Sequence, residues 1–541
     1  MRRILASILA LLASAAPAQD APTRDLAVIN APLPDDQAAL KAHVLFLADD
    51  VLKGREASSP EFMIAAHYVA AQFYAAGLRP AGDRGGYLQD VPLVAYRAAD
   101  HGDVVLTRDG TPRALVFGED YIPGAVAGHA STTIDAPVVF VGQGIVAPGY
   151  GRDDYAGVDV RGKIVAILGG VPNKFQSEER AHFASPATKA EIAVQHGAIG
   201  MIVIVPRAGG GTANGWDRAR TTWANPDGTG FVPGAPILAT LSGTGGATLF
   251  AGAKTPWATI VKGAGNDSPP FHAQQLPGTL TVSLHTAFEP SRSANVAGLL
   301  PGSDPKLQSE VVVLSAHLDH LGVGAPDATG DTIYNGAEDN ATGIASLIEE
   351  AKRFKASGKP PRRSILFLAV TAEEKGLVGS DYFARHPTVP RDHIVADVNL
   401  DMPILTYAFQ DMTVFGADRS TLGPIVSKAV AAMGLTLSPD PDPGQGLFVR
   451  SDHYRFVQQG IPSVFLWPGE AGAGKAAWAD FFAHHYHQPS DEIGQKLDWA
   501  QGVRFVAANY AIARAIADDD ARPRWNKGDF FGLLYHGYGA Q

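Results

Sequence analysis

The chain has 541 residues, of which 46% are hydrophobic and 18% charged, and its formal net charge is −11. This composition is typical of a globular protein, and the length predicts two or more packed units because single cores rarely grow so large. The negative charge, without any run of lysine or arginine, argues against nucleic acid and anionic membrane surfaces as partners.

Residues 1–18 predict a secretory signal peptide. Two arginines precede an apolar run over residues 4–13, and the small residues 16–18 form a suitable cleavage site before Gln19. The run is too short for a membrane anchor, which needs roughly 20 apolar residues. We therefore expect an exported protein, periplasmic or secreted, with no membrane span after signal removal.

The chain contains no cysteine. Any metal site would have to be built from histidine and carboxylate side chains, so cysteine-based structural zinc sites are excluded.

The N-terminal half predicts two different kinds of structure. Apolar residues at helical spacing predict helices within residues 34–80, and residues 86–118 change to short alternating runs with a hairpin signal at Asp109-Gly110. Residues 131–262 are rich in Gly and Pro and hold strand-like pieces around one helical stretch. They predict a small separate α/β module, which carries out no chemistry because it lacks clustered histidines and acidic residues.

From residue 278 onward, continuous apolar runs alternate with helical segments. Such runs are typical of strands buried on both faces, and the alternation predicts a mostly parallel sheet covered by helices. Ligands bind at the carboxyl ends of the strands in these sheets. Functional residues are therefore expected where the apolar runs end.

Histidines and acidic residues follow several of these runs. The candidates are His317, Asp339, Glu373, Glu374, Asp401 and His487. Crowding these carboxylates at one edge of a low-dielectric sheet costs several kcal/mol unless cations neutralise them, which predicts two divalent ions. Without cysteine, a histidine and carboxylate set favours zinc over manganese or cobalt.

Adjacent Glu373 and Glu374 leave their strand in different directions, so both can hardly bind the same ion. One can coordinate a metal while the other acts as general base for a metal-bound water, whose pKa falls from about 15.7 towards about 7. Asp319 is well placed to hold the imidazole of His317 through its second nitrogen.

These motifs resemble the M28 family of co-catalytic zinc peptidases, particularly exported members with a protease-associated (PA) domain. The matching segments follow the family order from about residue 290 to 525, and residues 47–56 and 65–83 are similar to the family's N-terminal helices. The motifs are SAHLDH (315–320), NGAEDNATG (335–343), TAEEKGLVGS (371–380), VNLDM (398–402), RSDHYRF (450–456) and YHQPSDE (486–492).

The resemblance assigns the metal ligands. His317 and Asp401 would bind one zinc ion, Glu374 and His487 would bind the other, and Asp339 would bridge the two.

The resemblance also assigns roles around the metals. Glu373 would be the general base and proton shuttle, and Tyr486 would steady the tetrahedral intermediate. Arg450 would line the pocket near the amino end of the substrate.

Other polar residues of the motifs are set aside. Glu338 stands where many relatives carry Asp or Asn, and we expect it to face away from the ions. His320, His484 and His485 are interpreted as structural hydrogen-bonding residues beside the ligands.

The resemblance implies a phosphorylase/hydrolase-like α/β fold, with a mixed, mostly parallel sheet flanked by helices and a small inserted α/β PA domain. The expected segments are a signal peptide (1–18), the N-terminal part of the catalytic domain (24–130), the PA domain (131–262), the M28 peptidase catalytic domain (263–525) and a C-terminal tail (526–541).

The implied activity is that of a metallo-aminopeptidase with two zinc ions per chain. It would hydrolyse the N-terminal bond of peptides with a free N-terminus by a zinc-bound hydroxide, with the substrate amine held by Glu373 and Asp401. Three alternatives stay open: a carboxypeptidase of the same family, for which Arg450 is the only evident anchor of a terminal carboxylate; a glutaminyl cyclase-like acyltransferase with one zinc; and a catalytically dead receptor-like module.

Overall fold

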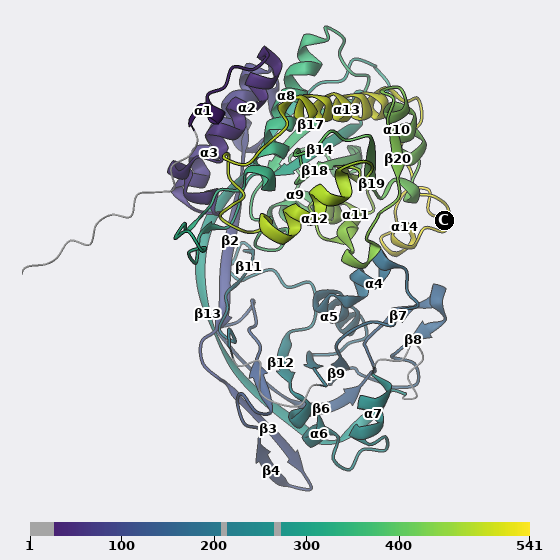
Figure 1. Cartoon of the computed structure of the whole chain (residues 1–541). Helices are drawn as coiled ribbons and strands as arrows, with labels where there is room; N and C mark the ends of the chain where they lie inside the picture. The colour runs from purple at the N-terminus through teal and green to yellow at the C-terminus, as the bar shows by residue number, and fades with distance from the viewer. Residues whose placement is uncertain (1–25, 207–213, 265–271) are drawn as a thin grey trace, which may run out of the picture.

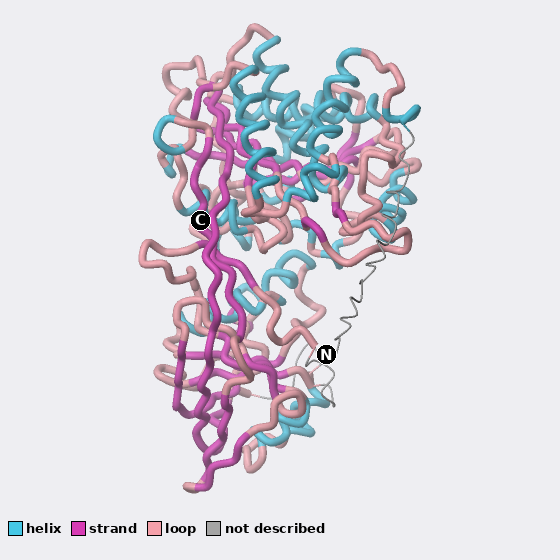
Figure 2. Tube along the Cα trace, turned by 90° about the vertical axis from the view of Figure 1, so that its left-hand side faces the viewer, coloured by secondary structure: helices cyan, strands magenta, loops and turns pink. Residues whose placement is uncertain are grey.

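The computed structural model describes residues 26–206, 214–264 and 272–541, so the predicted signal peptide lies outside the described residues. The chain forms two lobes (Figure 1), a larger one that holds the N-terminal helices and the C-terminal half, and a smaller one built from the middle of the chain. One long strand, β13 (Gln274–Leu300), runs through both lobes, as the side view in Figure 2 shows.

Parallel strands form the centre of the larger lobe. In spatial order they are β17 (Ser364–Val370), β14 (Val311–His317), β18 (Ile394–Leu400) and β21 (Ser463–Pro468). Every residue of these strands is buried, as the continuous apolar runs predict for strands covered on both faces.

Antiparallel and short strands extend this sheet at both edges. On one side β13 pairs with β17, β2 (Leu88–Ala98) and β1 (Arg79–Pro80) pair with β13, and β11 (Arg220–Trp223) pairs with β2. On the other side β19 (Asp411–Phe415) runs antiparallel to β21, and β20 (Thr436–Ser438) runs parallel to β19.

Helices cover both faces of this sheet. Val312 and Leu314 of β14 belong to the core shared with one set of helices, whereas Val313 packs with Phe383 and Phe456 on the opposite face. The first set is α2 (Asp35–Leu47), α3 (Pro60–Ala75), α8 (Thr342–Ala356), α10 (Leu422–Ala431) and α13 (Trp499–Asp518), and the second is α9 (Val378–Arg385) and α11 (His453–Val457). The predicted fold class, a mixed and mostly parallel sheet flanked by helices, is confirmed.

The remaining elements of the larger lobe are short. They are α1 (Leu26–Ile29), η1 (Asp50–Arg55), η2 (Asp83–Gly85), β15 (Gly322–Val323), β16 (Ile333–Tyr334), η4 (Ala337–Ala341), η5 (Arg391–His393), η6 (Ala417–Arg419), η7 (Pro443–Gln445), η8 (Leu447–Val449), α12 (Gly474–His484) and α14 (Phe530–Leu534). Within the described ranges, no helix combines the length and the hydropathy that crossing a membrane requires.

The smaller lobe has its own sheet. Its strands in spatial order are β4 (Thr111–Ala114), β3 (Asp103–Arg108), the first half of β13, β6 (Ser131–Phe140), β9 (Ile164–Leu168), β10 (Gly200–Ile204), β12 (Ile237–Leu241) and β5 (Tyr121–Pro123). The helices and short elements beside it are α4 (Ser177–Ala184), α5 (Pro186–Gln195), α6 (Gly243–Phe250), α7 (Trp257–Gly263), β7 (Val146–Ala147), η3 (Pro148–Tyr150) and β8 (Arg152–Asp153). This sheet therefore includes strands on both sides of residues 131–262.

The β3–β4 hairpin forms where the sequence predicts it. Asp109 and Gly110 have φ values of 49° and 77°, and a tight hairpin turn of this kind needs positive φ at both central residues.

Helix α4 of the smaller lobe packs on the larger lobe. His182 Nδ1 lies 2.7 Å from the hydroxyl of Tyr454, and Arg419 binds both Glu178 of α4 and Asp529 near the C-terminus. The C-terminal segment is part of this junction, because Phe531 of α14 is fully buried there.

Replacing Phe531 by alanine is expected to destabilise the larger lobe. The ring lies 5.4 Å from that of Phe448 and 5.8 Å from that of Tyr454, so the change leaves a cavity that costs about 3–5 kcal/mol in the free energy of unfolding. Urea unfolding followed by tryptophan fluorescence measures the loss. The control is Leu534→Ala, at a side chain 43% exposed on the same helix, and equal losses for the two variants would contradict the packing role.

Candidate metal centre

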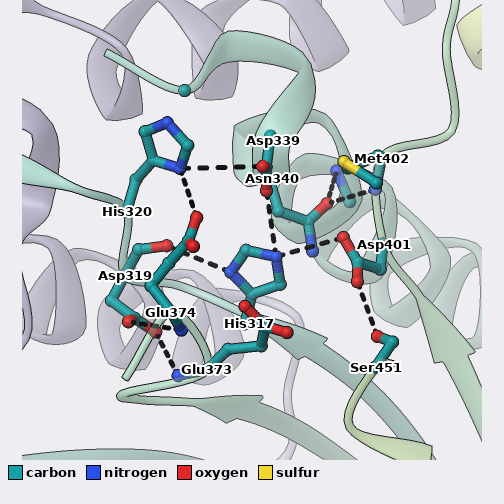
Figure 3. Close-up of polar contacts among 12 residues, drawn as sticks. His317, Asp319, His320, Asp339, Asn340, Glu373, Glu374, Asp401, Met402 and Ser451 are labelled. Atoms are coloured by element: carbon teal, nitrogen blue, oxygen red, sulfur yellow. Dashed lines mark hydrogen bonds and ion pairs between the residues drawn. The ribbon is translucent and has the colours of Figure 1, made fainter. Parts of the chain in front are cut away.

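The predicted ligands meet at the carboxyl edge of the parallel strands, and Figure 3 shows all of them except His487. His317 is the last residue of β14, Glu374 lies in the loop after β17, and Asp401 directly follows β18. Asp339 belongs to η4, and His487 follows α12. Residues that are up to 170 positions apart in the sequence (317 to 487) therefore share one site.

The ligand atoms form two groups that share Asp339. His317 Nε2 lies 3.1 Å from Asp339 Oδ1 and 3.1 Å from Asp401 Oδ1. His487 Nε2 lies 3.3 Å from Asp339 Oδ2 and 3.3 Å from Glu374 Oε2. Asp339 thus turns one carboxylate oxygen towards each group.

These distances fit the dimensions of a zinc site. Zinc binds nitrogen and oxygen at about 2.0–2.1 Å in tetrahedral geometry, which puts neighbouring ligand atoms about 3.3 Å apart. The group His317, Asp339 and Asp401 is fully buried, and the side chain of Glu374 is only 5% exposed. Buried carboxylates of this kind are stabilised by a bound cation.

His320, which sequence analysis set aside, also lies in the second group. Its Nδ1 is 2.8 Å from Glu374 Oε1 and 3.8 Å from Asp339 Oδ2, and the residue is completely buried. His487 is more open, with 34% of its side chain exposed. The SAHLDH motif could have indicated that His320 lies at the site, since His320 follows His317 by three positions.

His484 and His485 do not reach the metal groups. His484 Nδ1 lies 2.9 Å from Asp480 Oδ1, and His485 Nδ1 lies 3.1 Å from the carbonyl oxygen of Ser490. Both make the structural contacts expected of them.

The charges of the site shift the pKa values of its members. Burial alone would lower the pKa of His317, but the carboxylates of Asp401, Glu373 and Asp339 outweigh it and raise that pKa well above its usual value. Burial opposes ionisation of Asp339, yet the imidazoles of His320, His317 and His487 hold its pKa well below the usual range. Histidines and carboxylates therefore stabilise one another's charges here.

Glu373 lies beside the ligands in the same pocket, which His317, Asp401 and Tyr486 also line. Withdrawal from water and the neighbouring carboxylates raise the pKa of Glu373 well above its usual value, against the opposing effect of His317. A carboxylate in this environment binds a proton readily, as an acid–base catalyst must.

Asp319 contacts His317 through a different atom than predicted. The carbonyl oxygen of Asp319, not its carboxylate, lies 3.0 Å from His317 Nδ1. The carboxylate instead accepts hydrogen bonds from the backbone N–H groups of Glu373 (3.1 Å) and Glu374 (3.4 Å). The loop after β17 turns its amides towards Asp319, and this draws the carboxylate away from the imidazole.

Glu338 faces away from the metal groups. Its Oε1 accepts a hydrogen bond from the backbone N–H of Leu405 at 2.7 Å. Burial, with a contribution from Asp491, raises the pKa of Glu338 to about 8.

Two residues that sequence analysis did not single out hold ligands in place. Asp491 accepts hydrogen bonds from the backbone N–H of Glu338 (2.9 Å) and of Asp339 (3.0 Å), which fixes the loop that carries the shared carboxylate. The Ser451 hydroxyl donates to Asp401 Oδ2 at 2.5 Å. Both residues lie inside motifs of the family resemblance, Asp491 in YHQPSDE and Ser451 in RSDHYRF, and this position could have indicated a role at the site.

Arg55, also missed, fixes the backbone around the site. Its buried guanidinium donates to the carbonyl oxygens of Leu47, Leu318, Asn335 and Gly336 at 2.5–3.0 Å. Burial lowers its pKa to about 10, so it stays charged at neutral pH near the carboxylates. One side chain therefore ties the N-terminal segment to the loops next to His317 and Asp339.

Part of the lining of the pocket at the metal groups is apolar. Its apolar lining consists of Met402, Leu447, Phe465, Trp467, Phe482 and Tyr486. The Tyr486 ring stacks on that of His487 at 3.8 Å, and Arg450 stands at the rim.

Backbone conformations that side chains rarely adopt flank the ligands. Ala372, Met402 and His487 have φ values of 54°, 46° and 56°. Such positive φ values cost free energy in non-glycine residues and cluster at functional sites.

Residues 295–513 match the sequence profile described as peptidase family M28. This stretch includes all five predicted metal ligands and Glu373. The PA assignment of residues 131–262 falls outside the matched residues.

Individual proteins resemble the chain over part of its length. It is 29% identical over 224 residues to leupeptin-inactivating enzyme 1 of Streptomyces exfoliatus, covering 39% of this chain and 46% of that protein. It is 26% identical over 310 residues to a probable leucine aminopeptidase 2 of Aspergillus oryzae, covering 54% and 58%. The chain spans about half the length of these curated relatives. Among solved structures, an aminopeptidase from Aneurinibacillus sp. strain AM-1 aligns over 90% of this chain and 95% of its own, with 19% identity and a TM-score of 0.47.

Replacing Arg55 by lysine is expected to weaken zinc binding by about 10–100-fold, the usual effect of removing a residue that orients metal ligands. Lysine keeps the charge but cannot reach four carbonyl oxygens at once. Competition with a chelator measures the affinity. The control is Lys53→Ala, two residues away, whose side chain is 61% exposed. Unchanged affinity in Arg55→Lys would refute the role given to Arg55.

Proposed function

We propose that this chain is an exported zinc aminopeptidase that holds two zinc ions and removes the N-terminal residue of peptides. The single observation that carries the proposal is the pair of ligand groups that share Asp339, with Glu373 beside them in an open pocket. The M28 match of this stretch and the aminopeptidase names of its relatives support the same activity.

His317 and Asp401 are proposed to bind one ion, and Glu374 and His487 the other, with Asp339 between them. Bound zinc would supply Lewis acidity, which polarises the scissile carbonyl and makes water a better nucleophile at neutral pH. His487 is preferred to His320 because its Nε2 is equally distant from both carboxylates and because it lines the pocket that substrate enters.

The chain's own residues would move the proton and hold the substrate. The Glu373 carboxylate takes a proton from the attacking water and delivers it to the nitrogen of the leaving amine. Tyr486 donates a hydrogen bond to the developing oxyanion, and its hydroxyl is protonated at neutral pH because burial raises its pKa. The carboxylates of Glu373 and Asp401 attract the substrate's ammonium group.

The apolar wall of the pocket favours an apolar N-terminal residue in the substrate, because burying its side chain there contributes about 25 cal/mol per Å². The smaller lobe, including residues 131–262, is proposed to be a PA domain that shapes the access to this pocket. Export through the signal sequence 1–18 is part of the same proposal.

The deciding experiment compares two peptides that differ only at the amino end. We expect the zinc-loaded protein to release leucine from a free-amine peptide and to leave its N-acetylated form intact. Turnover of the blocked peptide alone would favour the carboxypeptidase alternative. Cyclisation of an N-terminal glutamine without release would favour a glutaminyl cyclase-like enzyme.

Replacing Glu373 by glutamine is expected to lower kcat by at least about 100-fold while zinc content stays the same, because the amide cannot accept the proton. Steady-state kinetics and metal analysis on the same sample measure both quantities. The matched control is Glu289→Gln on the exposed stretch of β13. Full activity in Glu373→Gln would remove the general base from the proposal.

Zinc content separates the two histidines of the second group. We expect His487→Ala to retain about one zinc ion per chain and His320→Ala to retain about two, because His487 spans both carboxylates of its group at ligand distance. Metal analysis after dialysis gives the ratio. The reverse pattern would make His320 the ligand.

A further inference from the structure

A cavity of about 570 Å³ lies between the two lobes, next to the metal pocket. Helices α4 and α5 of the smaller lobe form one wall, and the segment from Gly444 to Gln458 of the larger lobe forms the other, where α4 and α5 face α11 in Figure 1. Arg450 lines both this cavity and the metal pocket, so the two spaces adjoin at its side chain. We call this space the interlobe cavity.

The interlobe cavity is positively charged, although the chain carries a net charge of −11. Its charged lining residues are three arginines, Arg180, Arg450 and Arg455, and a single acid, Glu191. The arginines come from both lobes, since Arg180 lies on α4 and Arg455 on α11. A potential of this sign attracts anions and repels an ammonium group.

Protein carboxylates do not fully neutralise these arginines. Within the described residues, Arg180 has no ion pair, and Arg450 has only a 3.3 Å hydrogen bond to the side-chain amide of Gln445. Arg455 lies 4.0 Å from Asp381 and donates to the side chain of Gln458 and to the carbonyl oxygen of Gly376, while its Nε is buried without a hydrogen bond. The guanidinium groups keep donors available for a ligand.

A substrate with its amine at the metal groups must direct its remaining residues out of the pocket. Aromatic side chains such as Trp467 and Phe482 line the metal pocket, and Arg450 is the residue that lines both this pocket and the interlobe cavity. The residues after the scissile bond would therefore enter this cavity. Arg450 then faces the carboxyl side of the substrate and not its amino end, where a cation would repel the ammonium group.

We propose that the interlobe cavity binds a carboxylate on the leaving side of the substrate and that Arg180 and Arg450 make this selection. The class of substrate is a peptide with an apolar first residue and an anionic group shortly after the scissile bond. The anion is either an acidic side chain or the C-terminal carboxylate of a short peptide. The inference rests on the proposed function, because it assumes that the metal pocket takes the N-terminal residue.

Two peptide pairs distinguish the sources of the carboxylate. Leu-Gly-Glu-amide against Leu-Gly-Gln-amide tests an acidic side chain, and Leu-Gly-Gly against Leu-Gly-Gly-amide tests the terminal carboxylate. For the zinc-loaded full chain we expect kcat/KM to favour the anionic member of at least one pair by about tenfold, as one charge-assisted hydrogen bond would give.

The variant Arg180→Gln should abolish most of this preference and leave the hydrolysis of leucine p-nitroanilide unchanged, because that substrate carries no carboxylate. The matched control is Arg113→Gln, an exposed arginine on β4 of the same lobe. Equal kcat/KM within both pairs, or an equal loss for anionic and neutral peptides in Arg180→Gln, would overturn the inference while the proposed function stands.

Binding measurements keep the two proposals separate. If the protein hydrolyses none of these substrates, the proposed function fails, and calorimetry with Leu-Gly-Glu-amide and Leu-Gly-Gln-amide still tests the cavity. Tighter binding of the anionic peptide that Arg180→Gln removes would support the inference. Equal affinities would refute it.

Discussion

The concentration of negative charge at one buried edge of the sheet is the constraint on which this structure depends. Asp339, Asp401, Glu373 and Glu374 meet where the parallel strands end, among imidazoles and largely withdrawn from water. In a low-dielectric interior such a group is stable only when positive charge lies close by. The histidines and Arg55 supply part of that charge, and the ligand spacing leaves room for cations to supply the rest.

The need to stabilise these carboxylates explains why contacts from distant segments surround the predicted ligands. Asp401 receives the Ser451 hydroxyl, the loop of Asp339 is held by Asp491, and His317 is oriented by a carbonyl oxygen. A metal site needs its donors aligned before the ion arrives, because disordered donors lose entropy on binding. The interlobe cavity adds a second charge pattern, since Arg180 of the smaller lobe joins Arg450 and Arg455 of the larger lobe beside a site that is itself acidic.

Much of the fold, and the meeting of the predicted ligands at one edge of the sheet, could be predicted because both depend on local pattern. The runs that became β14, β17 and β18 are mostly apolar, and each has a predicted ligand at or just after its last residue, at the edge where strands of this kind end together. The preference for zinc over manganese or cobalt followed from the histidine and carboxylate side chains alone. The stretch of β13 between the lobes was harder to predict, because residues 289–292 are exposed and polar while their backbone pairing with β2 continues.

The contacts that could not be predicted from the sequence depend on the path of the backbone. Arg55 donates to four carbonyl oxygens, and carbonyl groups carry no residue-specific signal. Asp319 meets His317 through its main chain for the same reason. His320 looked like a neighbour of the predicted ligand His317, and only the turn after β14 directs its ring towards Glu374. The domain boundaries at 131 and 262 remain predictions.

The pairing of β2 with β13 has a topological consequence. The chain leaves the larger lobe along β2 and returns along β13, and the two strands stay in register from Ala98 opposite Thr286 to Leu88 opposite Val296. The smaller lobe is therefore an insertion at the tip of the β-hairpin that β2 and β13 form, and the chain enters and leaves it through these two paired strands. A short turn between β2 and β13 would be enough to connect the two strands, so the larger lobe does not need the smaller lobe for its chain connectivity. Insertions of different size could occupy this position without changing the strand order of the larger sheet.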